Sequence, residues 1–147
     1  MRAVLQRVLQ AAVEVGGERI AAVGPGLLVL LGVGRDDGPA DVDAIAEKIV
    51  HLRIFADAAG HMNRSVKDVG GELLVVSQFT LYADSRRGRR PSYTDAAPPE
   101  VAEPLYRACV ERLRGSGLVV REGIFRADMK VSLTNDGPVT LLLDTRA

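Results

Sequence analysis

Hydrophobic and polar residues alternate along the first part of the chain, which is the pattern of β-strands that bury one face. The alternation predicts strands at residues 3–8 and 12–15, then a turn at Gly16-Gly17 and a third strand at residues 20–23. Residues 27–33 are instead continuously apolar. Such a run is typical of a strand buried on both faces, so we expect it in the middle of a sheet.

Two later segments carry apolar residues at the spacing of an amphipathic helix. The first predicted helix covers residues 39–52, and its apolar stripe is Val42, Ile45, Ala46, Ile49 and Val50. The second covers residues 98–114, and its stripe is Val101, Leu105, Ala108, Cys109 and Leu113. Pro104 fits badly inside a helix because it lacks a backbone N–H. We therefore expect the second helix either to begin near Glu103 or to be kinked at Pro104.

Further strands complete the predicted sheet. Residues 73–79 form a second buried strand, and shorter strands follow at 119–120, 129–133 and 139–143. The helices are separated by long stretches of strand and do not alternate strictly with single strands. This order favours an α+β fold over a doubly wound sheet.

The composition indicates one globular domain over residues 1–147, with 19 basic and 19 acidic side chains. Zero net charge argues against a protein that is basic over its whole surface and binds nucleic acid that way. The single cysteine, Cys109, excludes an internal disulfide and multi-cysteine zinc sites, and its apolar helical context predicts a core thiol. Neither His51 nor His61 lies in a metal-binding motif, so we expect no metal and no cofactor.

No segment of the sequence indicates export or membrane insertion. Met1-Arg2 is followed by alternating residues, not by an apolar signal segment. The longest apolar run, residues 27–33, is too short to span a bilayer. We therefore expect a soluble cytoplasmic protein.

One segment concentrates positive charge: Arg86, Arg87, Arg89 and Arg90 lie on either side of Gly88. The tract is either a solvated basic loop or a clamp for phosphate groups, which arginine binds through two parallel hydrogen bonds. A phosphate clamp predicts binding that weakens as salt is added.

Two polar motifs are candidates for chemistry. Ser77-Gln78-Phe79-Thr80-Leu81 closes a buried strand, so its polar groups either satisfy the backbone there or line a site. Asn135-Asp136-Gly137-Pro138-Val139-Thr140 has the composition of a hairpin turn, although Gly-Pro also permits a rigid cis peptide. A Ser-His-Asp hydrolase is not indicated, because neither histidine lies near a nucleophile motif.

Together these motifs resemble the SQFTL and NxGPxT signatures of the D-aminoacyl-tRNA deacylases. Residues 1–8, 26–33, 88–93 and 127–133 also match, so the resemblance covers essentially the whole chain. Arg126 departs from the family, which usually has glycine just before Ala127, and Tyr93 stands for the usual phenylalanine.

The resemblance implies a mostly antiparallel, barrel-like sheet with two packed helices. It also implies hydrolysis of the ester between a D-amino acid, or mischarged glycine, and the 3′-terminal adenosine of tRNA. Members of the family are homodimers with two sites at the interface. In them the cis Gly137-Pro138 peptide would enter the partner's site, where its carbonyls would clash with an L side chain but not with a D side chain.

The resemblance further assigns roles within the site. Main-chain N–H groups near Phe79 and Thr80 would form an oxyanion hole, while Ser77 and Gln78 would orient the adenosine. The ribose 2′-OH would assist the attacking water, because neither motif offers a conventional base. The remaining substrate-binding positions would be Leu81, Met129, Asn135, Gly137, Pro138 and Thr140. The tRNA-binding positions would be Arg86, Arg87, Arg89 and Arg90.

Two other functions fit the residues. One is a non-catalytic RNA-binding module in which Phe79 and Tyr82 stack on bases. The other is a general hydrolase of small esters or peptides.

Overall fold

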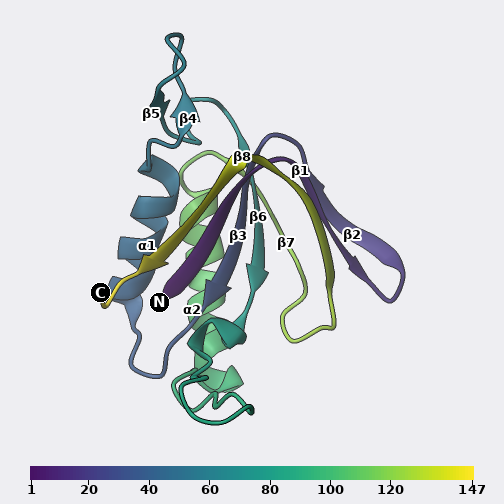
Figure 1. The fold of residues 1–147 in the computed structure, drawn as a ribbon, viewed down its shortest axis with the longest axis vertical. Coiled ribbons are helices and arrows are strands. Elements are labelled where there is room, and N and C mark those ends of the chain that lie inside the picture. The colour runs from purple at the N-terminus through teal and green to yellow at the C-terminus, as the bar shows by residue number, and fades with distance from the viewer.

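The computed structural model describes residues 1–147 and shows a strongly curved sheet flanked by two helices (Figure 1). In chain order the elements are β1 (Arg2–Val15), β2 (Glu18–Val23), β3 (Gly26–Gly32), α1 (Pro39–His51), β4 (Phe55–Ala56), β5 (Met62–Arg64), β6 (Glu72–Ser77), the 3₁₀ turn η1 (Phe79–Tyr82), α2 (Pro99–Arg114), β7 (Val119–Glu122) and β8 (Lys130–Asp144).

The sheet is built around the long strand β1. One edge of β1 pairs with β8, while its other edge pairs with β3 at residues 2–8 and with β2 at residues 11–15. The two strands predicted at 3–8 and 12–15 are therefore one strand, because both halves continue along the same partner. The predicted buried strand is confirmed as β3, which lies between β1 and β6.

The sheet is mixed, which corrects the expectation of a mostly antiparallel sheet. β1 runs antiparallel to its neighbours, whereas β3 is parallel to β6 and β6 is parallel to β7. Parallel neighbours need a crossover connection, and here α1 and α2 supply the two crossovers. The predicted α+β class, with a barrel-like sheet and two packed helices, is confirmed.

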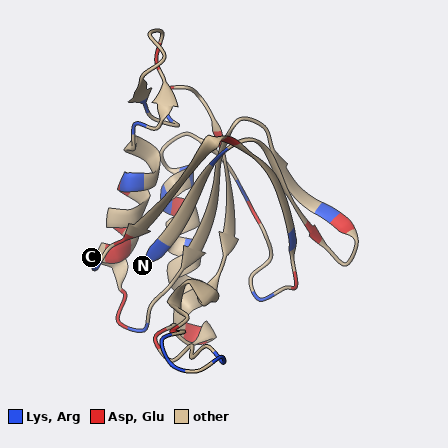
Figure 2. Cartoon of the chain, in the orientation of Figure 1, with Lys and Arg blue, Asp and Glu red and all other residues tan.

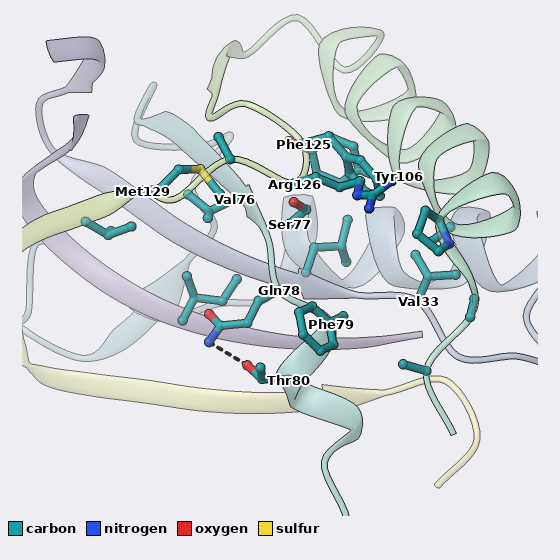
Figure 3. A pocket seen from close by; sticks show the side chains of 18 of the residues that line it. Val33, Val76, Ser77, Gln78, Phe79, Thr80, Tyr106, Phe125, Arg126 and Met129 are labelled. Atoms are coloured by element: carbon teal, nitrogen blue, oxygen red, sulfur yellow. Dashed lines mark hydrogen bonds between the residues drawn. The ribbon is translucent and has the colours of Figure 1, made fainter. Parts of the chain in front are cut away.

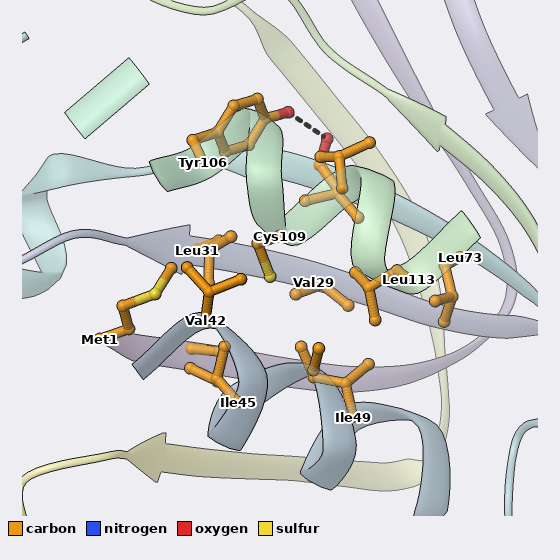
Figure 4. Close-up of a cluster of buried hydrophobic side chains, with 14 of the residues drawn as sticks. Met1, Val29, Leu31, Val42, Ile45, Ile49, Leu73, Tyr106, Cys109 and Leu113 are labelled. Carbon is orange, nitrogen blue, oxygen red and sulfur yellow. Dashed lines mark hydrogen bonds between the residues drawn. The ribbon is translucent and has the colours of Figure 1, made fainter. Parts of the chain in front are cut away.

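The main hydrophobic core lies between the sheet and the two helices. Figure 4 shows Val29 and Leu31 of β3 facing Val42, Ile45 and Ile49 of α1. Residues that alternate with these, such as Leu28 and Val76, form a second cluster on the opposite face of the sheet, where no helix contributes. Both faces of β3 are thus buried, as its continuous apolar run predicts.

Helix α2 differs from its prediction in register. It begins at Pro99 and continues through Pro104, so it does not begin near Glu103. Its buried residues are Ala102, Tyr106, Cys109, Val110 and Leu113, while Val101 is 40% exposed. The predicted stripe was wrong at Val101 and Ala108, which are exposed, because the helix is rotated so that Ala102, Tyr106 and Val110 face the core. Cys109 is a core thiol, and burial raises its pKa to about 12.

Strand β8 also differs from its prediction. The segments predicted at 129–133 and 139–143 belong to one strand, so residues 135–140 do not form a hairpin turn. Thr140 pairs with Gln6 and Asn135 pairs with Val8, so only Arg7 of β1 faces residues 136–139. These four residues therefore bulge out of the ladder while both flanks stay paired with β1.

Two further differences are local. β6 ends at Ser77, and Phe79 belongs to η1 instead of the strand. β4 and β5, which the pattern did not predict, pair with each other in a short hairpin. None of the helices is long and apolar enough to cross a membrane.

Candidate active site

A cavity of about 840 Å³ opens at the carboxyl end of β6. Its walls come from β3, β6 and η1, from residues 93–99 and the first turns of α2, and from residues 125–133, which follow β7 and continue into β8. Figure 3 shows Gln78, Phe79 and Thr80 on one side, with Phe125, Arg126 and Tyr106 on the other. The cavity therefore joins segments that are far apart in the sequence.

The SQFTL motif is held rigidly where β6 ends. Ser77 pairs with Leu31, and the backbone N–H of Gln78 donates to the Leu31 carbonyl at 2.8 Å. The chain then turns into η1, whose Tyr82 is buried against Gly34. A Cβ at Gly34 would lie 2.8 Å from the Tyr82 ring, so glycine is required for this close approach. Tyr82 is therefore not free to stack on a base, which removes half of the platform proposed for an RNA-binding module.

Two backbone donors in η1 are free. Phe79 and Thr80 are the first residues of the 3₁₀ turn, and neither of their N–H groups donates a hydrogen bond within the chain. The Thr80 hydroxyl accepts a hydrogen bond from Gln78 Nε2 at 2.9 Å. This part of the cavity thus offers N–H donors and a positioned hydroxyl.

Aromatic rings line two opposite walls of the cavity. Phe79 is 58% exposed and meets Tyr93 edge-on, with ring centroids 5.1 Å apart. On the other wall Tyr106 packs against Phe125 at 5.7 Å and donates through its hydroxyl to Glu122 at 3.3 Å. Burial, followed by the charge of Glu122, raises the pKa of Tyr106 far above its usual value, so this hydroxyl stays protonated.

The cavity has no conventional general base. His51 lies at the end of α1 and His61 lies next to β5, and neither lines the cavity. Asp128 is the one carboxylate in the lining, and it forms an ion pair with Lys130 at 3.1 Å. No group of three His, Cys, Asp or Glu side chains is arranged to hold a metal ion.

The second motif lies outside the cavity of its own chain. Gly137 and Pro138 are exposed, and the peptide bond between them is cis. Arg7 holds the bulge from the facing strand: its Nε donates to the Asp136 carbonyl at 3.2 Å and its Nη1 donates to the Ile54 carbonyl at 2.7 Å. Asn135 closes the bulge by accepting from the Val139 N–H at 3.1 Å and donating to Thr140 Oγ1 at 2.9 Å.

The arginine tract forms an exposed loop after η1, visible as the blue loop at the bottom of Figure 2. Arg86 is engaged within the loop, because its guanidinium makes two hydrogen bonds to Asp84, at 2.7 and 2.9 Å. This pairing lowers the pKa of Asp84 to about 2. Arg87, Arg89 and Arg90 form no ion pair.

Comparison with known proteins decides the family. The family model described as D-Tyr-tRNA(Tyr) deacylase matches residues 4–144. The chain belongs to this family. It is accordingly a hydrolase that acts on ester bonds.

Individual relatives match over almost their full length. A D-aminoacyl-tRNA deacylase of Anaeromyxobacter dehalogenans is 61% identical, covering 99% of this chain and 98% of its own. One of Desulfitobacterium hafniense is 58% identical, covering 99% and 97%.

Two solved structures share the fold. One titled c-Myc DNA Unwinding Element Binding Protein is 43% identical, with a TM-score of 0.94 and full coverage of both chains. A probable eukaryotic D-amino acid tRNA deacylase is 17% identical, with a TM-score of 0.82 over 97% of each chain.

The cavity brings together only some of the site residues expected from sequence. Ser77, Gln78, Phe79, Thr80 and Met129 line it. Leu81 does not; its carbonyl accepts a hydrogen bond from Arg2 at 3.0 Å. Sequence reasoning also missed lining residues, namely Gln6, Tyr93, Tyr106 and Phe125. A polar Gln6 within an alternating strand was the only available signal, since the other positions depend on which strands pair.

Proposed function

We propose that the chain, acting as one domain over residues 1–147 in the cytoplasm, hydrolyses the ester between a D-amino acid and the 3′-terminal adenosine of tRNA. The observation that carries this proposal is that Phe79 and Thr80, which line the cavity, are the first residues of a 3₁₀ turn and so have backbone N–H groups without an acceptor in that turn. Glycine mischarged on tRNA is also a substrate, because it has no side chain to exclude. The family and the names of its relatives support the same activity.

The reaction depends more on stabilising the developing oxyanion than on a strong base, because an aminoacyl ester is already activated. Water attacks the ester carbonyl, and negative charge develops on its oxygen in the tetrahedral intermediate. The N–H groups of Phe79 and Thr80 hold that oxygen. The ester C–O bond then breaks, and the ribose 3′-oxygen leaves as a hydroxyl by taking up the proton that the attacking water gives up. The neighbouring 2′-OH orients the water, and Ser77 and Gln78 orient the adenosine.

Removing the Thr80 side chain tests this mechanism. Its hydroxyl is occupied by Gln78 and has no histidine beside it, so it lacks the partner that a nucleophile needs. We expect Thr80→Ala to keep most of the deacylase activity, because the backbone N–H at that position remains. Activity that falls to background in a folded Thr80→Ala protein would favour covalent catalysis by the hydroxyl.

The bulge at residues 136–139 excludes L-amino acids from the site of a partner subunit in a homodimer. It cannot act on its own cavity, whose lining includes none of these residues, yet it is exposed and braced by Arg7. The outer edge of β8 is unpaired and Leu142 beside it is 78% exposed, which supports association through this strand. A braced main-chain element excludes every L side chain regardless of its identity.

Subunit mixing tests this arrangement. Deleting residues 136–138 leaves only Val139 opposite Arg7, so β1 and β8 should still pair on both sides of the deletion. We co-express this deletion with a Gln78→Ala, Phe79→Ala cavity variant, each chain carrying its own tag. The deletion homodimer, whose cavities are intact but face no bulge, should cleave L-tyrosyl-tRNA as well as D-tyrosyl-tRNA. A mixed dimer contains one intact cavity facing one intact bulge, and we expect it to cleave the D-substrate alone. Mixed dimers that still cleave L-tyrosyl-tRNA would mean that the bulge and the cavity act in the same chain.

Incubation with D-tyrosyl-tRNA and L-tyrosyl-tRNA tests the function itself, with loss of the ester as the readout. We expect cleavage of the D-substrate alone, and less of it when the terminal ribose lacks its 2′-OH. A non-catalytic RNA-binding module would cleave neither substrate. A general esterase would cleave both and would not need the 2′-OH.

A further inference from the structure

Arg126 has a backbone conformation that arginine rarely adopts. Its φ is 68°, and it is the one residue other than glycine with a positive φ. It occupies the third position of a turn closed by a hydrogen bond from the Ala127 N–H to the Ile124 carbonyl at 3.1 Å. A positive φ at this turn position favours glycine. Strained backbone conformations of this kind cluster at functional sites.

The Arg126 side chain belongs to the cavity wall. Figure 3 shows it beside Phe125 and Tyr106, across from Phe79 and Thr80. Only two charged side chains line the cavity, Arg126 and Asp128. Asp128 is paired with Lys130 at 3.1 Å, whereas Arg126 forms no ion pair. The positive charge of Arg126 is therefore the one charge in the cavity wall without a partner.

We propose that Arg126 binds a phosphate of the acceptor end of the tRNA and so anchors the substrate beside the ester. This inference rests on the proposed function. The aminoacyl end carries a positive ammonium group, which a guanidinium repels, and negative phosphodiesters, which it attracts. Arginine suits phosphate because its planar fork matches two phosphate oxygens. Arg126 contacts the substrate from the segment between β7 and β8, apart from the arginine tract that follows η1.

Charge removal at Arg126 tests the anchor. We compare Arg126→Gln with Arg121→Gln, a matched control in which an exposed, unpaired arginine of β7 lies outside the cavity lining. With D-tyrosyl-tRNA we expect Arg126→Gln to raise KM about 10-fold with little change in kcat, as for loss of a charged hydrogen bond. The slope of log kcat/KM against log salt should fall by about 0.7, the value for one phosphate contact to a single strand. Arg121→Gln should match the wild type in both.

A phosphate-free substrate separates this anchor from a general effect on the site. With 3′-O-(D-tyrosyl)adenosine, which has no phosphate, Arg126→Gln and the wild type should cleave at equal rates. Arg126→Gly reports on the fold: glycine suits the positive φ, so its Tm should rise by about 2–4 °C while its KM for tRNA rises as in Arg126→Gln.

Three results would overturn the proposal: an unchanged KM and salt slope for D-tyrosyl-tRNA, an equal loss on the phosphate-free substrate, or the same loss in Arg121→Gln. Each of these requires an active wild type. A wild type that cleaves no D-tyrosyl-tRNA would instead refute the proposed deacylase activity, and the anchor with it. The two failures are therefore distinguishable.

Discussion

Neutralising the free arginines of the 86–90 loop should weaken tRNA binding in a salt-dependent way. Arg87, Arg89 and Arg90 are exposed and form no ion pair, while Arg86 is held by Asp84 at 2.7 Å. The perturbation is therefore a triple variant, Arg87→Gln, Arg89→Gln, Arg90→Gln, and Arg86→Gln is its control within the same loop.

The magnitude follows from the number of free guanidinium groups. Each phosphate contact contributes about 0.7–0.9 to the slope of log affinity against log salt. If each of the three free arginines meets one phosphate, the triple variant loses a slope of about 2–3. Between about 50 and about 200 mM salt, the wild type should then lose about 16–60-fold more affinity than the triple variant. Arg86→Gln should change the slope little, because its charge is already neutralised by Asp84.

The assay is equilibrium binding of uncharged tRNA across a salt series, so that catalysis does not intervene. Circular dichroism of each variant checks that the loop changes leave the fold intact. An unchanged slope in the triple variant would refute the reasoning and place these arginines away from the RNA. A slope that falls as much in Arg86→Gln as in the triple variant would also refute it, because the ion pair with Asp84 would then not matter.

Three further changes probe the supports of the site. Gly34→Ala should destabilise the protein by about 1–3 kcal/mol and lower deacylase activity, since its Cβ would lie 2.8 Å from the Tyr82 ring that seats η1. Gly38→Ala is the control, because a Cβ at Gly38 would meet no atom within 4 Å. If thermal unfolding shows the same loss of stability in both variants, the close contact with Tyr82 is not the cause. Arg7→Ala removes the brace of the 136–139 bulge, so the ratio of D- to L-tyrosyl-tRNA cleavage rates should fall at least about 10-fold; an unchanged ratio would mean that the brace does not set chirality. The pKa of Asp144 is lowered because burial, which would raise it, is outweighed by hydrogen bonds from the Arg146 N–H and from Arg2. The ionised Asp144 therefore stabilises the fold fully above pH 3.8, the ordinary pKa, and this stabilisation is lost as the pH falls through the lowered pKa. In Asp144→Asn the free energy of unfolding should accordingly fall less steeply with decreasing pH than in the wild type. An equally steep fall in both proteins would contradict this assignment.

Elements that depend on local pattern could be predicted from the sequence. The stripe of α1 and the continuous apolar run of β3 are set by residues close together in the chain. Prediction failed where long-range pairing decides. The segment 135–140 has the composition of a hairpin turn, yet it is a bulge within β8 because both of its flanks find partners on β1. Likewise, a mixed sheet follows from which strands become neighbours, not from any one strand's composition.

In the candidate site too, some residues could be predicted from local pattern and others depend on tertiary packing. The SQFTL motif was visible because its polar residues follow a buried strand directly. Arg126 was noticed only as a departure from the family's pattern. Its positive φ and its place in the cavity wall emerge from the turn at 124–127 and from the packing of that turn beside α2.

The sequence by itself determined the two helices, the central buried strand and the two motifs, because these depend on side-chain spacing and on local backbone preferences. Only the tertiary structure decided that one motif lines a cavity while the other stands outside it, braced by Arg7. The physical reason is that a cavity wall is assembled from strands and turns distant in the chain. Their meeting is governed by the pairing of β1 with both β3 and β8, which no local pattern records.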